Sequence, residues 1–164
     1  MQFAKQLERL ARILPGVAGY QDRESARDTD KAVRLRVAAE LEVLKRQLEE
    51  EEEKQLDKKE LSVLPALDRA ASKLDKLGNL TRYAARGYSP LFAGDLLDQK
   101  ILERLYVFDL GLFDELESIR NEVKQIGRLH AEADALNEAI KKLGRSLDEF
   151  EKNFSERQKL FKTK

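Results

Sequence analysis

Two aspartates interrupt otherwise apolar helical stripes, and they are the residues of this chain best placed to do chemistry. Asp30 shares one helix face with Val33 and Val37, and Asp109 falls between the apolar positions of a strongly hydrophobic stripe. Burying an unpaired carboxylate costs several kcal/mol, so each aspartate requires a hydrogen-bonded basic partner if it faces a core. The pattern therefore predicts a polar network inside an apolar interior.

Arginines are the expected partners of both aspartates. Antiparallel packing would bring Asp30 beside Arg82 or Arg86. It would also bring Asp109 beside Arg34 or Arg36. Such a network either fixes the register of the helices through ion pairs, or surrounds a pocket for a polar ligand or a transferable proton, or stays exposed to solvent. The predicted internal polar network comprises Arg23, Arg27, Asp30, Arg34, Arg82, Arg86 and Asp109.

Other chemistries have little support in the residue types. The chain has no cysteine, which excludes thiolate nucleophiles and cysteine-ligated metals. Its single histidine, His130, lacks the glutamate three positions earlier that a carboxylate-bridged dimetal bundle requires. Neither a glycine-rich phosphate loop nor a Gly-x-Ser-x-Gly elbow occurs. We therefore expect no enzyme activity, no catalytic residue, no cofactor and no metal site.

The charge balance narrows the classes of partner. The chain of 164 residues carries 31 basic and 31 acidic side chains, so its formal net charge is zero. Nucleic-acid-binding domains usually carry a basic excess, because phosphate neutralisation supplies much of their affinity. No stretch approaches the roughly 20 apolar residues of a membrane span. We expect a soluble cytoplasmic protein without a nucleic-acid partner, and peripheral membrane contact stays open.

Hydrophobic periodicity predicts the elements that must position the aspartates. Apolar residues recur every four and three positions from Leu129 onward, which is typical of one long helix facing a partner helix. This seam comprises Leu129, Ala133, Leu136, Ile140, Leu143, Leu147, Phe150 and Phe154, with Phe161 two intervals further on.

Three further stripes predict a single all-α domain over residues 1–164. We expect an up-down-up-down four-helix bundle of antiparallel, coiled-coil-like helices, because the connections are short. The alternative is an elongated coiled-coil hairpin that dimerises, so monomer and homodimer both remain open. The acidic run 49–53 predicts a frayed or solvent-projecting helix end. The expected elements are an amphipathic helix over 1–14 and long helices over 22–57, 62–86, 95–126 and 129–162.

One end of the predicted bundle gathers aromatic side chains. The linker ending at Tyr20 meets the loop that carries Tyr88, Leu91 and Phe92. These side chains either plug the end of the core or form a docking surface for a protein partner, since exposed aromatic anchors are typical of interaction hot spots.

The N-terminal helix has two possible uses. Its apolar stripe of Phe3, Leu7, Leu10 and Leu14 lies opposite basic residues, as in helices that bind anionic lipid surfaces. The same stripe would be satisfied equally by packing on the bundle.

Several segments resemble those of a known group of proteins. The segment PGVAGYQDRE at 15–24, followed by segments 87–92 and 105–109, is similar to a family of uncharacterised prokaryotic all-helical proteins. The likeness covers most of residues 7–115. Members of that family are encoded near membrane-associated SPFH (band 7) proteins, which implies a scaffold or accessory role at membranes. The resemblance brings no catalytic residues with it.

Two classes of function follow from these observations. The first is a non-enzymatic helical scaffold or protein-interaction module, accessory to a membrane-associated assembly. The second is a small-ligand-binding or catalytic bundle with an internal polar pocket around Asp30 and Asp109. We favour the first, with a protein partner of unknown identity.

Overall fold

The chain folds into helices throughout the part that the structure describes. The computed structural model describes residues 2–84, 99–129 and 132–161, and these contain no strand. The all-α prediction is therefore confirmed. The elements are α1 (Gln2–Ile13), α2 (Arg23–Asp57), a 3-10 turn η1 (Leu61–Val63), α3 (Leu64–Arg82), α5 (Gln99–Arg128) and α6 (Ala133–Lys159).

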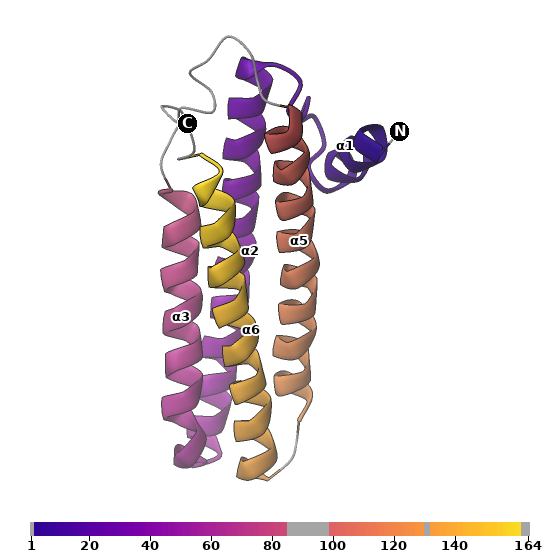
Figure 1. The fold of residues 1–164 in the computed structure, drawn as a ribbon. Helices are drawn as coiled ribbons and strands as arrows, with labels where there is room; N and C mark the ends of the chain where they lie inside the picture. Colours follow the sequence, from indigo (N-terminus) through magenta and orange to yellow (C-terminus); the bar gives the residue numbers. More distant parts are fainter. Residues whose placement is uncertain (1, 85–98, 130–131, 162–164) are drawn as a thin grey trace.

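The four long helices form a bundle with α1 beside it (Figure 1). Helix α2 packs against α3 and α5, and α6 packs against the same two helices, so α2 and α6 stand diagonally opposite. Helices α2 and α5 run in the same direction, and α3 and α6 run the opposite way (Figure 1). The start of α2, the end of α3, the start of α5 and the end of α6 therefore lie at one end of the bundle.

The predicted seams form the core. Burial of each large apolar side chain in these seams stabilises the fold by about 1.5–3 kcal/mol. The partner of the C-terminal seam lies within the same chain, because α6 packs against α3 and α5. The buried residues of this seam are Leu136, Ile140, Leu143, Leu147, Phe150, Phe154 and Phe161.

Several helix boundaries differ from those expected. Asp22 caps α2 by accepting hydrogen bonds from the amides of Glu24 and Ser25, both at 3.0 Å. Helix α3 ends at Arg82 rather than at residue 86, and α6 begins at Ala133 rather than at 129. Helix α5 was expected to end before Gly127 but continues through it to Arg128, because a helical glycine costs only about 1 kcal/mol. Residues 95–98 of the expected third long helix lie outside the described residues.

The acidic run does not fray. Helix α2 continues through it to Asp57, and Glu51 is buried. The Gln55 amide donates to Glu51 Oε1 at 2.8 Å, and Lys54 Nζ lies 3.6 Å from the other oxygen. The prediction was wrong because Glu51 and Gln55 continue the inward face that Leu48 begins, one and two turns further along.

Helix α1 packs on α5 through its apolar stripe. Leu10 and Leu14 are buried, and the ring of Phe3 meets that of Tyr106 edge-on at 4.8 Å between centroids. Arg9 forms an ion pair with Asp114 of α5. The candidate membrane-contact residues Phe3, Leu7, Leu10 and Leu14 thus face the protein, because α5 supplies the apolar surface that lipid would otherwise provide.

Candidate functional site

Five polar side chains meet inside the end of the bundle where α2 starts and α6 ends. We call them the buried charge cluster. Tyr20 comes from the linker after α1, Asp30 and Arg34 from α2, Asp109 from α5 and Arg157 from α6. All five are buried.

Arg157 is the centre of the cluster. Its Nε donates to Asp109 Oδ1 at 2.6 Å, and its Nη2 donates to Asp30 Oδ1 at 2.9 Å. Nη1 donates to the side chain of Gln158 at 2.8 Å. The guanidinium also lies over the ring of Phe161, 5.1 Å from its centroid, in a cation–π contact. One side chain of α6 therefore bridges α2 and α5.

Arg34 extends the cluster to the fourth helix. Its Nε donates to Asp30 Oδ2 at 3.0 Å, and its Nη1 donates to the backbone carbonyl of Arg82 at 3.2 Å. The last carbonyls of a helix have no partner within the helix and carry partial negative charge, so a cation there is favourable. The cluster consequently joins all four long helices.

Tyr20 attaches the linker to the same cluster. Its hydroxyl donates to Asp109 Oδ2, and its backbone N–H donates to the Tyr106 hydroxyl at 2.8 Å. The two tyrosine rings meet edge-on, 4.9 Å between centroids. Gly19 precedes Tyr20 with a φ of +79°, and a Cβ there would collide with Leu7 and the Tyr106 hydroxyl. Glycine is therefore required for this approach of the backbone.

The charges of the cluster balance. Two carboxylates face two guanidiniums, so the formal sum is zero. Burial raises the pKa of Asp109, and Arg157 opposes that shift. Burial and the nearby Asp109 carboxylate raise the pKa of Tyr20 well above its ordinary value. Although burial alone would lower the pKa of Arg157, the surrounding oxygens of Asp109, Tyr20 and Asp30 raise it. The Tyr20 hydroxyl and the Arg157 guanidinium thus hold their protons firmly.

The oxygens of the cluster are all bonded to protein donors. Each oxygen of Asp30 and Asp109 accepts a hydrogen bond from a described residue, and the Tyr20 hydroxyl donates one. Such a network rigidifies a core and specifies one packing arrangement. It presents no unbonded carboxylate oxygen to a substrate.

The predicted ion pairs are only partly correct. Asp30, Arg34 and Asp109 do belong to one network, but Asp109 bonds to Arg157 rather than to Arg34 or Arg36. Arg36 instead bonds to Glu40, one turn along its own helix. The prediction was wrong because the antiparallel helix beside Asp109 is α6, whose C-terminal turn reaches the level of Asp109.

The partners proposed for Asp30 also change. Arg82 contributes only its backbone carbonyl, because its guanidinium bonds to Glu42 at 3.1 Å. Arg27 lines a cleft beside Asp30. The side chains of Arg23 and Arg86 lie outside the described residues.

Arg157 was missed by the sequence reasoning, although the sequence contains a signal for it. The seam of α6 advances from Phe154 to Phe161 in two intervals, and Arg157 occupies the skipped position. A basic residue at a core position of one helix indicates an ion-pair partner for an aspartate at a core position of another helix.

Of the two roles predicted for the aromatic residues at this end, Tyr20 takes the first, plugging the end of the core, and not that of a docking surface. Tyr20 has no exposed surface, because its ring and hydroxyl are used inside the cluster. It cannot anchor a partner in this arrangement. The other three residues of that surface, Tyr88, Leu91 and Phe92, lie outside the described residues.

Comparisons of the chain with protein-family models, with curated proteins and with solved structures gave no match. The class is therefore defined by the structure alone, as an all-α helical bundle with a charge cluster buried at one end. Among the described helices, none is long and apolar enough to cross a membrane. Within the same residues no group of three or more His, Cys, Asp or Glu side chains could hold a metal ion.

Proposed function

We propose that this protein is a non-enzymatic helical scaffold that binds a partner helix along α2. The observation that carries the proposal is an exposed apolar stripe on that helix. Leu35 is 45% exposed and Val43 is 43% exposed, and the exposed Ala39 lies between them at the same helical spacing. Single exposed apolar residues are ordinary, but three in line on one helix are typical of a docking face.

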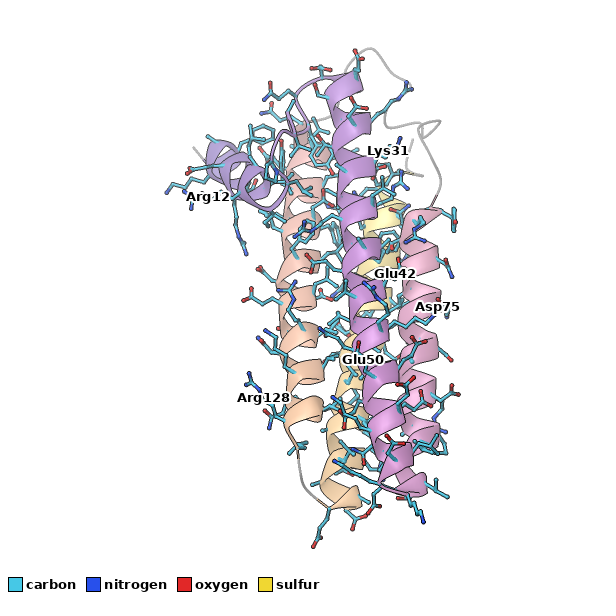
Figure 2. The ribbon with its side chains drawn as sticks, turned by 180° about the vertical axis from the view of Figure 1, so that it is seen from behind. Arg12, Lys31, Glu42, Glu50, Asp75 and Arg128 are labelled. Carbon is cyan, nitrogen blue, oxygen red and sulfur yellow. The ribbon has the colours of Figure 1, made fainter. Side chains whose placement is uncertain are left out.

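The stripe leads into a groove between α2 and α5, which we call the α2–α5 groove. Its volume is about 310 Å³. Figure 2 looks onto the outer face of α2, with α5 and α3 on either side. The groove is lined by Arg36, Ala39, Glu40, Val43, Leu44, Gln47 and Arg120.

The charges of the groove indicate the chemistry of the partner. Arg36 and Arg120 both bond to Glu40, so two cations surround one carboxylate and leave a formal charge of +1. The floor is apolar. An amphipathic helix with an apolar stripe and acidic flanks fits both features, in the helix-in-groove mode of recognition.

The buried charge cluster supports a scaffold rather than a catalyst. Its carboxylates are bonded to protein donors, and it ties the linker and all four long helices together. A rigid support lowers the entropic cost of binding a partner.

Site-specific cross-linking tests this proposal. A photoreactive phenylalanine analogue at Val43 should give a cross-linked adduct with a second polypeptide in the native cell. The same analogue at Glu49, exposed on the same helix but about 120° around its axis from Val43, is the matched control. Ala39→Arg should abolish the Val43 adduct, since it fills the groove and adds charge.

Three outcomes would contradict the proposal. They are equal labelling from both positions, no adduct from Val43, and an adduct that Ala39→Arg leaves unchanged. Mass spectrometry of the adduct identifies the partner, and an adduct with the chain itself would replace the partner helix by a second copy.

The link to a membrane-associated assembly rests on the resemblance of the sequence to proteins encoded beside SPFH (band 7) proteins. We extend the proposal to that setting, with the partner helix supplied by a component of the assembly. The second class of function, binding of a small ligand, is favoured by one specific observation, the cleft beside Asp30.

A further inference from the structure

A cleft opens between α2 and the end of α3, beside the buried charge cluster. Its volume is about 270 Å³. That is several times the roughly 30 Å³ that a water molecule occupies in the liquid, and is below the range of most drug-sized ligand pockets. The cleft is lined by Arg27, Asp28, Asp30, Lys31, Arg34, Leu35 and Arg82.

The lining is basic. Four cationic side chains face two carboxylates, which gives a formal charge of +2. Glu42, outside the lining, forms an ion pair with Arg82 at 3.1 Å and reduces this excess to +1. The cleft therefore favours an anion.

One nitrogen of Arg34 is uncommitted. Arg34 is only 4% exposed, and two of its three nitrogens donate to Asp30 and to the carbonyl of Arg82. The third nitrogen, Nη2, donates no hydrogen bond to a described residue. A buried donor of this kind costs free energy unless a ligand or water accepts its hydrogen bonds. Since Arg34 lines the cleft and its Nε and Nη1 are bonded to protein oxygens, its guanidinium is a fixed cation beside the cleft.

We propose that this cleft binds the phosphate group of a small molecule. A phosphate monoester carries a charge of about −1.5 to −2 at neutral pH, which is opposite in sign to the charge of the lining. A hydrogen bond from a guanidinium to a phosphate oxygen is charge-assisted, and Arg34, which is held in place by its bonds to Asp30 and Arg82, has one nitrogen left to donate it. Lys31 is exposed on α2 and supplies, in addition to Arg34, a cation on a flexible side chain. This site differs from the α2–α5 groove and does not depend on partner binding.

Titration of the intact chain with inorganic phosphate, followed by calorimetry, tests the site. Saturable binding is expected, and pyrophosphate should bind more tightly because it adds charge and acceptors. Lys31→Gln should weaken phosphate binding about tenfold, the effect of losing one charge-assisted hydrogen bond. Arg82→Gln should weaken it similarly, and Arg34→Lys should do so while retaining the charge beside Asp30. Arg46→Gln, on the same helix outside the cleft, should leave binding unchanged.

Two results would overturn the proposal. One is the absence of saturable binding to the wild-type chain. The other is binding that Lys31→Gln and Arg46→Gln weaken equally, which would indicate general attraction to a charged surface. Lys31 and Arg46 are both exposed, so their variants should fold normally. Succinate in place of phosphate distinguishes a carboxylate site, because equal or tighter binding of succinate would contradict the phosphate assignment.

Discussion

Arg157 Nε lies 2.6 Å from Asp109 Oδ1, and neither side chain has any exposed surface. The pair joins α6 to α5 inside the buried charge cluster, where Tyr20 and Asp30 also bond to it. A buried ion pair gains little net stability over an apolar pair, yet breaking one is costly because the remaining charge stays buried. This pair therefore fixes how the two helices meet.

Removing Arg157 should strongly destabilise the fold. Arg157→Met leaves Asp109 without its cation, and we expect the free energy of unfolding to fall by about 3–5 kcal/mol. Adding Asp109→Leu should restore a large part of that loss, because the Asp30–Arg34 pair stays intact. Urea denaturation followed by circular dichroism measures both effects.

Arg145→Met is the matched control for this measurement, since Arg145 is exposed on the same helix. It should change the free energy of unfolding by no more than about 0.5 kcal/mol. A loss as large as that of Arg157→Met would contradict the role given to the buried pair.

Tyr20 should make the protein sensitive to alkaline pH. An unfolded tyrosine loses its proton near pH ~10, whereas burial and Asp109 raise the pKa of folded Tyr20. The folded state therefore binds more protons above that pH, and the free energy of unfolding falls as pH rises. Tyr20→Phe should reduce this fall, measured by urea denaturation over a series of alkaline pH values. Burial also raises the pKa of Tyr106, so part of the fall should remain. Equal slopes for wild type and Tyr20→Phe would refute this assignment.

Gly19 and Gly16 provide a test of the linker that carries Tyr20. Both have positive φ, +79° and +90°, but only at Gly19 would a Cβ meet other atoms. Gly16→Ala should lower the free energy of unfolding by about 1–2 kcal/mol, because of backbone strain alone. Gly19→Ala should cost more, because Leu7 and Tyr106 must also move. Thermal denaturation of the two variants gives the comparison, and equal losses would show that the contact at Gly19 is relaxed easily.

The sequence predicts the helices well because one periodicity governs nearly all of them. The seam from Leu136 to Phe154 is buried as expected, and the chain supplies its own partner helices. Helix ends were less predictable. Gly127 stays helical because its neighbours in α5 are held by packing, and local propensity is too weak to oppose that.

The site was predictable only in part. Asp30 and Asp109 could be identified because they interrupt apolar stripes, which needs no knowledge of neighbours. Their partners could not be identified from the sequence, because an apolar stripe does not indicate which helices are adjacent or where along their lengths they meet. The choice between the two roles of Tyr20 was open for the same reason, since its burial depends on Asp109 and Tyr106, both more than 80 positions away.

We propose that the buried charge cluster holds the fold while the α2–α5 groove carries the function. The variant Tyr20→Phe, Asp109→Leu, Arg157→Met removes one carboxylate and one guanidinium together and retains the Asp30–Arg34 pair. Cross-linking from Val43 should be measured in this variant under conditions where circular dichroism shows it folded. We expect the same partner adduct as in the wild-type chain. Loss of the adduct in a fully folded variant would contradict the proposal, because the cluster would then take part directly in function.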